Sequence, residues 1–389
     1  MKISKLKTST RIEQSYDYLS GIVKYGQYND DPQKWAELLA ASGTGMVCYR
    51  RFTRFVLGKG FADTRFYKLA VNEKGTTADR MLRRHVDDYC KWRGFAFHVN
   101  YQMGRKAEIN YVPFENVRFA YDKVKGVVTG FYIHPDWGKR NTALKRFDAN
   151  EAVFIDFYNP DPAVIHEQVE KSGGWDKYNG QLIYCSADGE MVYPAPLYDC
   201  VNNDLSTEDA VSSVKNRNAK NNFLPAGMLV VKAKQKDTEE SKESNDFDEQ
   251  FRQFQGDESA CKIIKVAVEF DEEVPELVPF DVKNYDKEFD YSEKSVQANI
   301  GKVFMQPPVL RGELIAGKLG SSTEIQEATD FYNAITEPDR LFLEECYAMA
   351  FDGFQGLTSE SDFTIIPLEY EVKNKETVQE EEDVNNITE

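Results

Sequence analysis

Residues 304–322 constrain the fold of this chain more than any other stretch of the sequence. Adjacent prolines at 307 and 308 end a preceding helical pattern, because proline lacks a backbone donor and fixes φ. Three glycines follow at 312, 317 and 320, which predicts a mobile loop. Ser321 and Glu324 then have the spacing of a capping box, the start signal of a new helix. We therefore expect a helix, a sharp stop, a glycine-rich loop and a second helix in this order.

The second helix is predicted to be long and kinked, over residues 322–350. Apolar residues recur at helical spacing from Ile325 through Phe331 to Ile335, and the stripe resumes at Leu341. Pro338 falls inside this pattern, where it removes one backbone hydrogen bond and predicts a kink.

The first 195 residues read as a mixed α/β region. Residues 32–41 and 76–92 have the start signals and apolar stripes of amphipathic helices. Short segments of alternating apolar and polar residues, bounded by turn formers, predict strands over 95–101, 109–114, 117–121, 127–133 and 152–158. A sheet with helices packed on it follows from this order.

Residues 196–284 change in character. A proline-bracketed entry at Tyr193 leads into a helix whose last turns, 215–222, are polar on nearly all sides. A strand over 227–233, a short helix over 245–255 and a strand over 261–268 predict a small β-α-β insert, and a helix over 286–304 leads out of it. The chain closes with a predicted strand over 362–370 and an acidic tail.

Length and composition exclude several classes of protein. At 389 residues and 41% hydrophobic content, the chain predicts two or three packed units. Its apolar runs are far shorter than the about 20 residues of a membrane-spanning helix, and it begins without the apolar segment of a signal peptide. The six cysteines and four histidines lack ligand spacing. We expect cytosolic assembly, no membrane association, no metal and no cofactor.

Charge is distributed unevenly along the chain. The net charge is −17, but residues 1–150 carry 27 basic against 15 acidic side chains, whereas residues 151–389 carry 21 against 50. This acidity argues against sequence-specific binding of double-stranded DNA, which requires a basic face on the protein. A basic cluster remains in the first part, either as a solvated face or as a contact for phosphate or an acidic partner; it comprises Arg50, Arg51, Arg54, Arg80, Arg83, Arg84, Lys91 and Arg93.

No catalytic constellation stands out. Gly43-Thr-Gly45 lacks the third glycine and the Lys-Ser/Thr pair of a phosphate loop. Acidic pairs such as Asp87-Asp88 are adjacent in sequence, which separates the carboxylates in angle on any helix or strand. The sequence predicts a protein that is not an enzyme.

Residues 193–347 resemble the portal proteins of tailed bacteriophages, of the compact, long-tailed-phage type. The resemblance is carried by Tyr193-Pro-Ala-Pro, by Lys220-Asn-Asn-Phe-Leu-Pro-Ala-Gly and by Ile300-Gly-Lys-Val-Phe-Met-Gln-Pro-Pro-Val-Leu-Arg-Gly. Ser321-Ser-Thr-Glu-Ile-Gln-Glu-Ala and Ile335-Thr-Glu-Pro338 are similar to the kinked helix that follows in that family. The family's Asn-Gly-Phe is replaced here by Asn221-Asn-Phe, and residues 1–190 have no motif in common with the family.

The resemblance implies an α+β, portal-like fold. A mixed α/β wing would comprise residues 1–195, with 351–372 returning to it. Stem helices would span 196–223 and 285–305, a β-α-β clip 224–284, a tunnel loop 306–321, a long kinked wing helix 322–350, and an acidic tail or crown 373–389.

The resemblance further implies a homo-oligomeric ring, a dodecamer, at the portal vertex of the virion capsid and assembled in the host cytoplasm. Double-stranded DNA would pass through it without sequence preference during genome packaging and ejection. The implied partners are the terminase large subunit, a head–tail adaptor and the major capsid protein. We expect the DNA channel to be lined by Arg311, Gly312, Glu313, Gly317, Lys318 and Gly320, and partner binding to use Phe247, Phe251 and Phe254 of the clip.

Two other classes fit part of the pattern. Another phage head or tail structural protein shares the acidic, mixed composition but needs neither the proline–glycine succession nor a closed ring. A metal-dependent nuclease would bring carboxylates together from distant positions, which magnesium-dependent cleavage would reveal.

Overall fold

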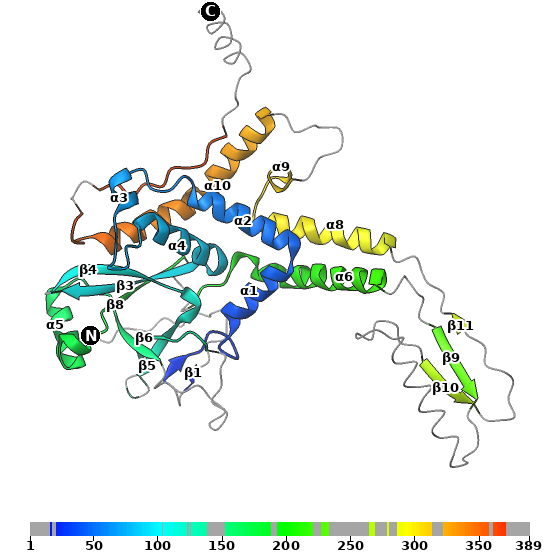
Figure 1. Cartoon of the computed structure of the whole chain (residues 1–389), viewed down its shortest axis with the longest axis horizontal. Helices are drawn as coiled ribbons and strands as arrows, with labels where there is room; N and C mark the ends of the chain where they lie inside the picture. Colours follow the sequence, from blue (N-terminus) through cyan, green and yellow to red (C-terminus); the bar gives the residue numbers. More distant parts are fainter. Residues whose placement is uncertain are drawn as a thin grey trace, which may run out of the picture. The chain divides into compact units, whose positions relative to one another are not determined.

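The computed structural model describes residues 16–17, 21–102, 104–122, 124, 126–137, 152–187, 193–220, 227–232, 264–268, 278–279, 286–312, 322–357 and 361–370 (Figure 1). The chain divides into two compact units. Unit 1 comprises Met1–Asn202 and Asn299–Glu389, and unit 2 comprises Asn203–Ala298.

Unit 1 contains an eight-stranded sheet in the order β1-β2-β5-β6-β7-β8-β3-β4. Neighbouring strands are antiparallel except β7 and β8, which are parallel and are connected through helix α5 (Pro162–Ser172). The strands are β1 (Tyr16–Asp17), β2 (Ile22–Val23), β3 (Gly94–Gln102), β4 (Arg105–Val112), β5 (Val117–Asp122), β6 (Val127–Ile133), β7 (Val153–Phe157) and β8 (Gln181–Ser186).

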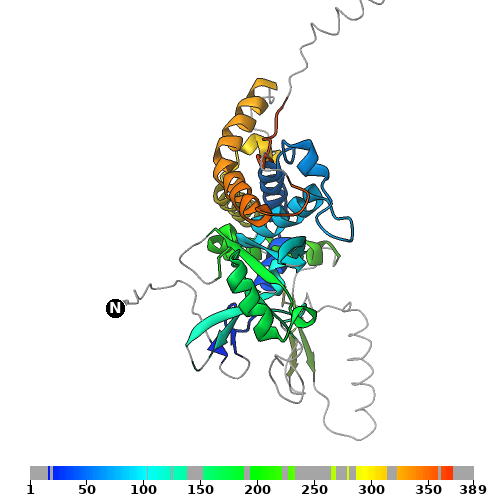
Figure 2. The same cartoon turned by 90° about the vertical axis from the view of Figure 1, so that its left-hand side faces the viewer.

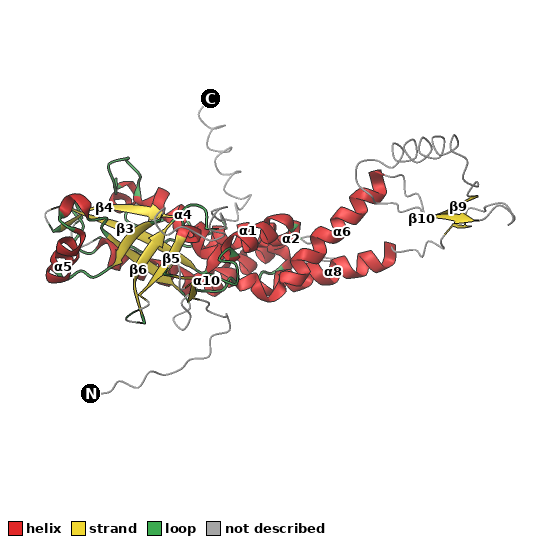
Figure 3. Ribbon diagram, turned by 90° about the horizontal axis from the view of Figure 1, so that it is seen from below, coloured by secondary structure: helices red, strands yellow, loops and turns green. Residues whose placement is uncertain are grey.

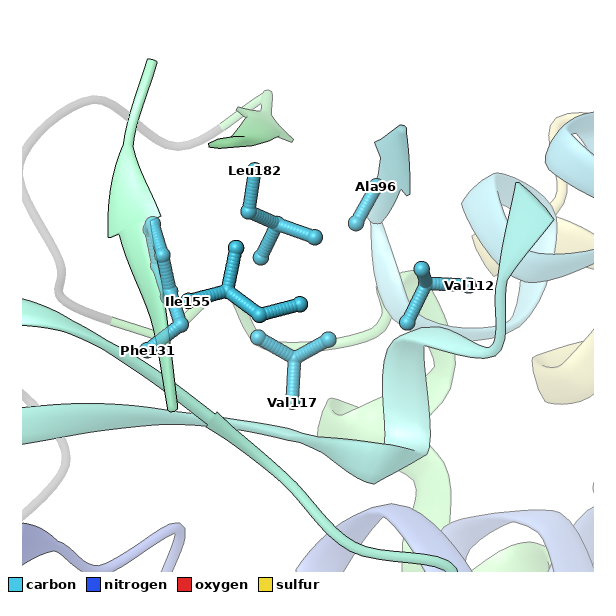
Figure 4. Packing of buried hydrophobic residues seen from close by; sticks show 6 residues of the cluster. All are labelled: Ala96, Val112, Val117, Phe131, Ile155 and Leu182. Atoms are coloured by element: carbon cyan, nitrogen blue, oxygen red, sulfur yellow. The ribbon is translucent and has the colours of Figure 1, made fainter. Parts of the chain in front are cut away.

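Six strands of this sheet each contribute one buried side chain to a common hydrophobic cluster (Figure 4). Each such side chain stabilises the fold by about 1.5–3 kcal/mol relative to an exposed one, less for alanine. The cluster comprises Ala96, Val112, Val117, Phe131, Ile155 and Leu182.

Helices gather on one side of the sheet (Figure 2). They are α1 (Asp31–Ala41), α2 (Gly43–Leu57), α3 (Thr64–Lys68), α4 (Ala78–Trp92) and α10 (Ser322–Phe351). The predicted apolar stripe of α4 is buried at Met81, Leu82 and Val86. Helix α2 begins where the Ser42 hydroxyl accepts a hydrogen bond from the Gly45 amide at 2.9 Å, so the glycine pair considered as a phosphate loop lies in the first turn of a helix.

The structure confirms most of the predicted elements of this unit and corrects one. Helices α1 and α4 and strands β3 to β7 lie where the sequence places them. The predicted strand over 362–370 is wrong: residues 361–370 are extended but form only an isolated bridge, between Ile365 and Phe61. Pro367 removes a ladder donor, and the segment bonds to the loop after α2, where the Lys59 amide donates to the Ile366 carbonyl at 2.7 Å.

Unit 2 contains most of helices α6 (Asn202–Lys220) and α8 (Asp286–Val303) and a small sheet of β9 (Gly227–Lys232), β10 (Ile264–Val268) and β11 (Val278–Pro279). Helices α6 and α8 lie side by side (Figure 3), and Lys215 pairs with Glu293 between them at 2.6 Å. Strands β9 and β10 are parallel, as a β-α-β insert requires. The helix expected over 245–255 lies outside the described residues.

Candidate functional site at the base of the glycine-rich segment

The turn that ends α8 has a strained backbone. Met305 has a φ of 51°, in the left-handed region, where a residue with a Cβ costs about 1–2 kcal/mol. Its amide donates to the Lys302 carbonyl at 3.0 Å, and its side chain is 62% exposed. The strain therefore persists only because the residues on either side of Met305 are held. We call residues 304–312 the loop base.

Phe304 is the first of these anchors. Its buried ring lies 6.1 Å from that of Phe52 in α2 and 6.3 Å from that of Tyr198, measured between centroids. Its carbonyl accepts a hydrogen bond from the Tyr332 hydroxyl at 2.9 Å. Burial raises the pKa of Tyr332, so this hydroxyl stays protonated and remains a donor across the physiological range.

Gln306 is the second anchor and is only 5% exposed. Its side-chain amide donates to the Cys48 carbonyl of α2 at 2.5 Å and to the Tyr332 oxygen of α10 at 3.1 Å. One buried side chain thus ties the end of α8 to two helices of unit 1. A buried donor left without its partner costs about 1–3 kcal/mol, so this geometry is strongly preferred.

The two prolines start a single helical turn, α9 (Pro308–Arg311). Pro308 takes the first helical position, where a missing amide costs nothing, and Gly312 ends the turn in the left-handed conformation with a φ of 84°. Leu310 is buried, which fixes the turn to the body of unit 1. The glycine-rich segment therefore departs from a defined position at Gly312.

Arg311 packs against the last turn of α8. Its guanidinium lies so close to Gly301 that a Cβ on that glycine would be 1.2 Å from Nη1. The absence of a side chain at Gly301 is therefore what accommodates Arg311 in this position.

The structure describes only two of the predicted channel residues, Arg311 and Gly312, and both belong to the loop base. The others lie outside the described residues, as do the predicted clip residues; these are Glu313, Gly317, Lys318 and Gly320, and Phe247, Phe251 and Phe254. Their roles remain predictions. The sequence reasoning assigned no role to Gln306, although it lies within the quoted Phe304-Met-Gln-Pro-Pro motif.

Helix α10, which begins on the far side of the glycine-rich segment, continues through Pro338 and changes direction along its length (Figure 2). Because proline has no backbone N–H, Pro338 donates no helical hydrogen bond to the Ala334 carbonyl. Arg340, itself buried, reaches back to donate to the Asn333 carbonyl at 2.7 Å and across to the Phe55 carbonyl of α2 at 3.1 Å.

The residue before Arg340 holds α10 to α4. One carboxylate oxygen of Asp339 accepts hydrogen bonds from the Tyr89 hydroxyl and from Arg93, each at 2.6 Å. Burial of these groups strengthens the attraction, because solvent screens it less. Both of these attachments to the helical layer follow Pro338, and the hydrogen bond from Arg340 to the Asn333 carbonyl spans the bend.

His85 joins α4, β3 and the C-terminal half of α10. Its Nδ1 lies 2.9 Å from the Tyr347 hydroxyl, and its Nε2 lies 3.2 Å from the Ala96 carbonyl. Because a carbonyl only accepts, Nε2 carries the proton and Nδ1 accepts from the tyrosine. Burial lowers the pKa of His85 to about 3, so the ring is neutral at physiological pH.

Within the described part of the chain, no three side chains of His, Cys, Asp or Glu come together as a possible metal site. None of the described helices is long and apolar enough to cross a membrane.

Comparison with solved structures supplies the context for this geometry. The chain is 13% identical to a protein in a structure described as the neck of an empty gene transfer agent (GTA) particle computed with C6 symmetry, with 93% of this chain and 89% of that chain covered and a TM-score of 0.53. A neck of a native GTA particle computed with C12 symmetry gives 14% identity, 92% and 89% coverage and a TM-score of 0.50. An HK97-family phage portal protein from Corynebacterium diphtheriae gives 9% identity, 76% and 83% coverage and a TM-score of 0.42.

The chain shares its fold with the proteins of these two GTA neck structures. This likeness in fold supports the resemblance that the sequence motifs indicate. No family model and no curated protein matches the sequence.

Proposed function

We propose that this chain is a phage portal protein, which forms a ring at one vertex of a capsid and conducts double-stranded DNA during packaging and ejection. The observation that carries the proposal is the loop base: within a portal-like fold, it fixes where a glycine-rich segment leaves the end of a helix. The similar neck structures were computed with C6 and C12 symmetry, which supports a ring of twelve copies.

The charge of the chain suits a conduit. Twelve copies of a chain with a charge of −17 carry −204 in total, and carboxylates along a bore form no close ion pairs with phosphates. At physiological salt, ions screen the repulsion between these carboxylates and the DNA phosphates over about 8 Å, so a duplex near the axis of the ring is not excluded. DNA therefore slides instead of binding.

Imaging of the purified full-length protein tests the ring. We expect particles with a central opening wide enough for duplex DNA and with twelvefold symmetry. A protein that stays a single compact copy at all concentrations would refute the proposal, and magnesium-dependent DNA cleavage by it would favour a nuclease instead.

The glycine-rich segment is proposed as the tunnel loop, with Glu313 and Lys318 facing the bore and Gly312, Gly317 and Gly320 acting as hinges, while Arg311 packs against α8 at the base of the loop. Deleting residues 315–318 should leave rings intact and reduce the length or retention of packaged DNA. The matched control is Lys68→Ala, which removes one exposed cation from α3. Unchanged DNA length and virion stability after the deletion would contradict this role.

The insert of unit 2 is proposed as the docking site for the terminase large subunit and then for a head–tail adaptor, while the major capsid protein surrounds the ring. Alanine at Phe247, Phe251 and Phe254 should weaken capture of the adaptor by assembled rings. Undiminished capture by rings of normal mass would show that these side chains do not bind it.

A further inference from the structure

Helix α10 presents a regular row of exposed side chains along its outward face. Successive members are three or four residues apart, the spacing that faces a partner helix in coiled-coil packing. Apolar residues occupy the middle of the row and acidic residues its ends; Phe331 is 58% and Leu341 is 50% exposed. We call this row the α10 seam; it comprises Glu327, Phe331, Ala334, Pro338, Leu341, Glu345 and Ala348 of α10 and Asp352, which directly follows the helix.

Single exposed apolar residues are common on a surface, but Phe331 and Leu341 lie on one row of α10 with Ala334 and Pro338 between them, which makes a continuous apolar strip. The opposite face of α10 is already used: Tyr332, Leu343 and Tyr347 are fully buried. In Figure 2, α10 (orange) lies along the margin of the helical layer, so its outward face is available to another molecule.

Helix α2 presents a second exposed row with the same spacing and the opposite charge. The α2 seam comprises Gly43, Val47, Arg50 and Arg54. Val47 is 47% exposed, and in the described part of the chain neither Arg50 nor Arg54 forms an ion pair. The buried face of α2, with Phe52 and Phe55, packs inward, so these arginines are left for an acidic partner.

We propose that the α10 seam of one copy packs against the α2 seam of the next copy and forms the contact between neighbouring subunits. This inference rests on the proposed ring and names the surfaces that build it. Because the two seams are different surfaces, the contact is head-to-tail and repeats around a ring, whereas a self-complementary surface would close a dimer.

The dimensions of the two helices are compatible. With Val47 against Leu341 at one end of the apolar part of the α10 seam, or against Phe331 at the other, Arg50 and Arg54 lie about 4.5 and 10.5 Å further along their helix, at 1.5 Å per residue. Glu327 lies about 6 Å beyond Phe331 at one end, and Glu345 lies about 6 Å beyond Leu341 at the other. The arginines therefore reach carboxylates in either helix direction.

Charge reversal tests the proposal in the full-length protein. Variant A carries Arg50→Glu and Arg54→Glu, and variant B carries Glu327→Lys and Glu345→Lys. Each variant alone places like charges across the contact, so we expect its ring fraction at a fixed concentration to fall at least tenfold by mass photometry. The matched control for variant A, Arg65→Glu with Lys68→Glu, makes the same change in net charge on exposed positions of α3 and should keep its rings.

Mixing is the decisive measurement, because equal amounts of variants A and B bring opposite charges together again at every contact. Rings with alternating copies should form from the mixture, and a chain carrying all four substitutions should assemble alone. Unaltered rings in A or B, or a mixture of folded A and B that does not assemble, would overturn the proposal while the portal function stands. A wild-type protein that forms no ring would instead refute the proposed function itself. If A and B form normal rings but lose capture of the capsid or motor protein, the seams bind that partner and the subunit contact proposed here is wrong.

Discussion

The contact between Gly301 and Arg311 gives a prediction in which the effect of one substitution on stability depends on the other residue. In an ordinary helix, Gly→Ala stabilises by about 0.8–1 kcal/mol because alanine loses less backbone freedom. Here the new Cβ would lie 1.2 Å from Nη1 and 2.4 Å from Cζ of Arg311, so the guanidinium has to leave its place. The displaced atoms are the far end of a flexible side chain, so the cost lies near the lower limit of the about 1–3 kcal/mol of overpacking and offsets the gain. We expect Gly301→Ala to bring no net stabilisation.

The double variant separates the two contributions. With Arg311→Ala the obstacle is absent, so Gly301→Ala should then stabilise by about 0.5–1 kcal/mol, and the coupling between the two substitutions should be about 1 kcal/mol. Urea denaturation of the four proteins of the cycle, followed by circular dichroism, measures it. Arg65→Ala, at an exposed position of α3, is the control background and should not change the effect of Gly301→Ala. Equal stabilisation by Gly301→Ala in all backgrounds would refute the reasoning about Arg311.

Three further predictions concern buried polar groups. His85→Gln keeps a hydrogen-bonding side chain but cannot titrate. Because the folded histidine has a pKa of about 3, only the unfolded chain binds a proton at this residue between about pH 6.5 and pH 3. In urea titrations between pH 6 and 4, the wild type should therefore lose about 1.4 kcal/mol more stability per pH unit than the variant. Tyr332→Phe leaves Gln306 without one partner and should destabilise by about 1–3 kcal/mol at neutral pH, whereas an unchanged urea midpoint would contradict the anchor. Lys106 donates a hydrogen bond to the Ala350 carbonyl at the end of α10, and burial lowers the pKa of Lys106 to about 8. The unfolded chain therefore keeps this proton to higher pH than the folded chain, and the stability of the wild type relative to Lys106→Met should rise between pH 8 and 10. A stability difference that stays constant over this range would contradict the lowered pKa.

The sequence predicted those parts of the fold whose signals are local. The apolar stripe of α4 and the alternation in β3 to β7 are complete within each element, so periodicity alone located them. Helix α2 was not predicted because Gly43 and Gly45, both poor helix formers, open it, although Cys48, Phe52 and Phe55 have helical spacing.

The site was predicted only in outline for a related reason. The proline–glycine succession marks the loop base, but Gln306 binds Cys48, 258 residues away in sequence, and Arg340 binds Phe55, 285 residues away. Nothing in the local pattern selects those partners. The fit of Arg311 against Gly301 likewise exists only after α8 has ended and the chain has turned back.

The bracing of α10 at Pro338 has a mechanical consequence. A proline bend without support is flexible, whereas here the hydrogen bond from Arg340 to the Asn333 carbonyl spans the bend, and Arg340 and Asp339 hold the segment after it to α2 and α4. We therefore expect the two halves of α10 to keep their relative direction, with the half that follows Pro338 also held to the sheet through His85.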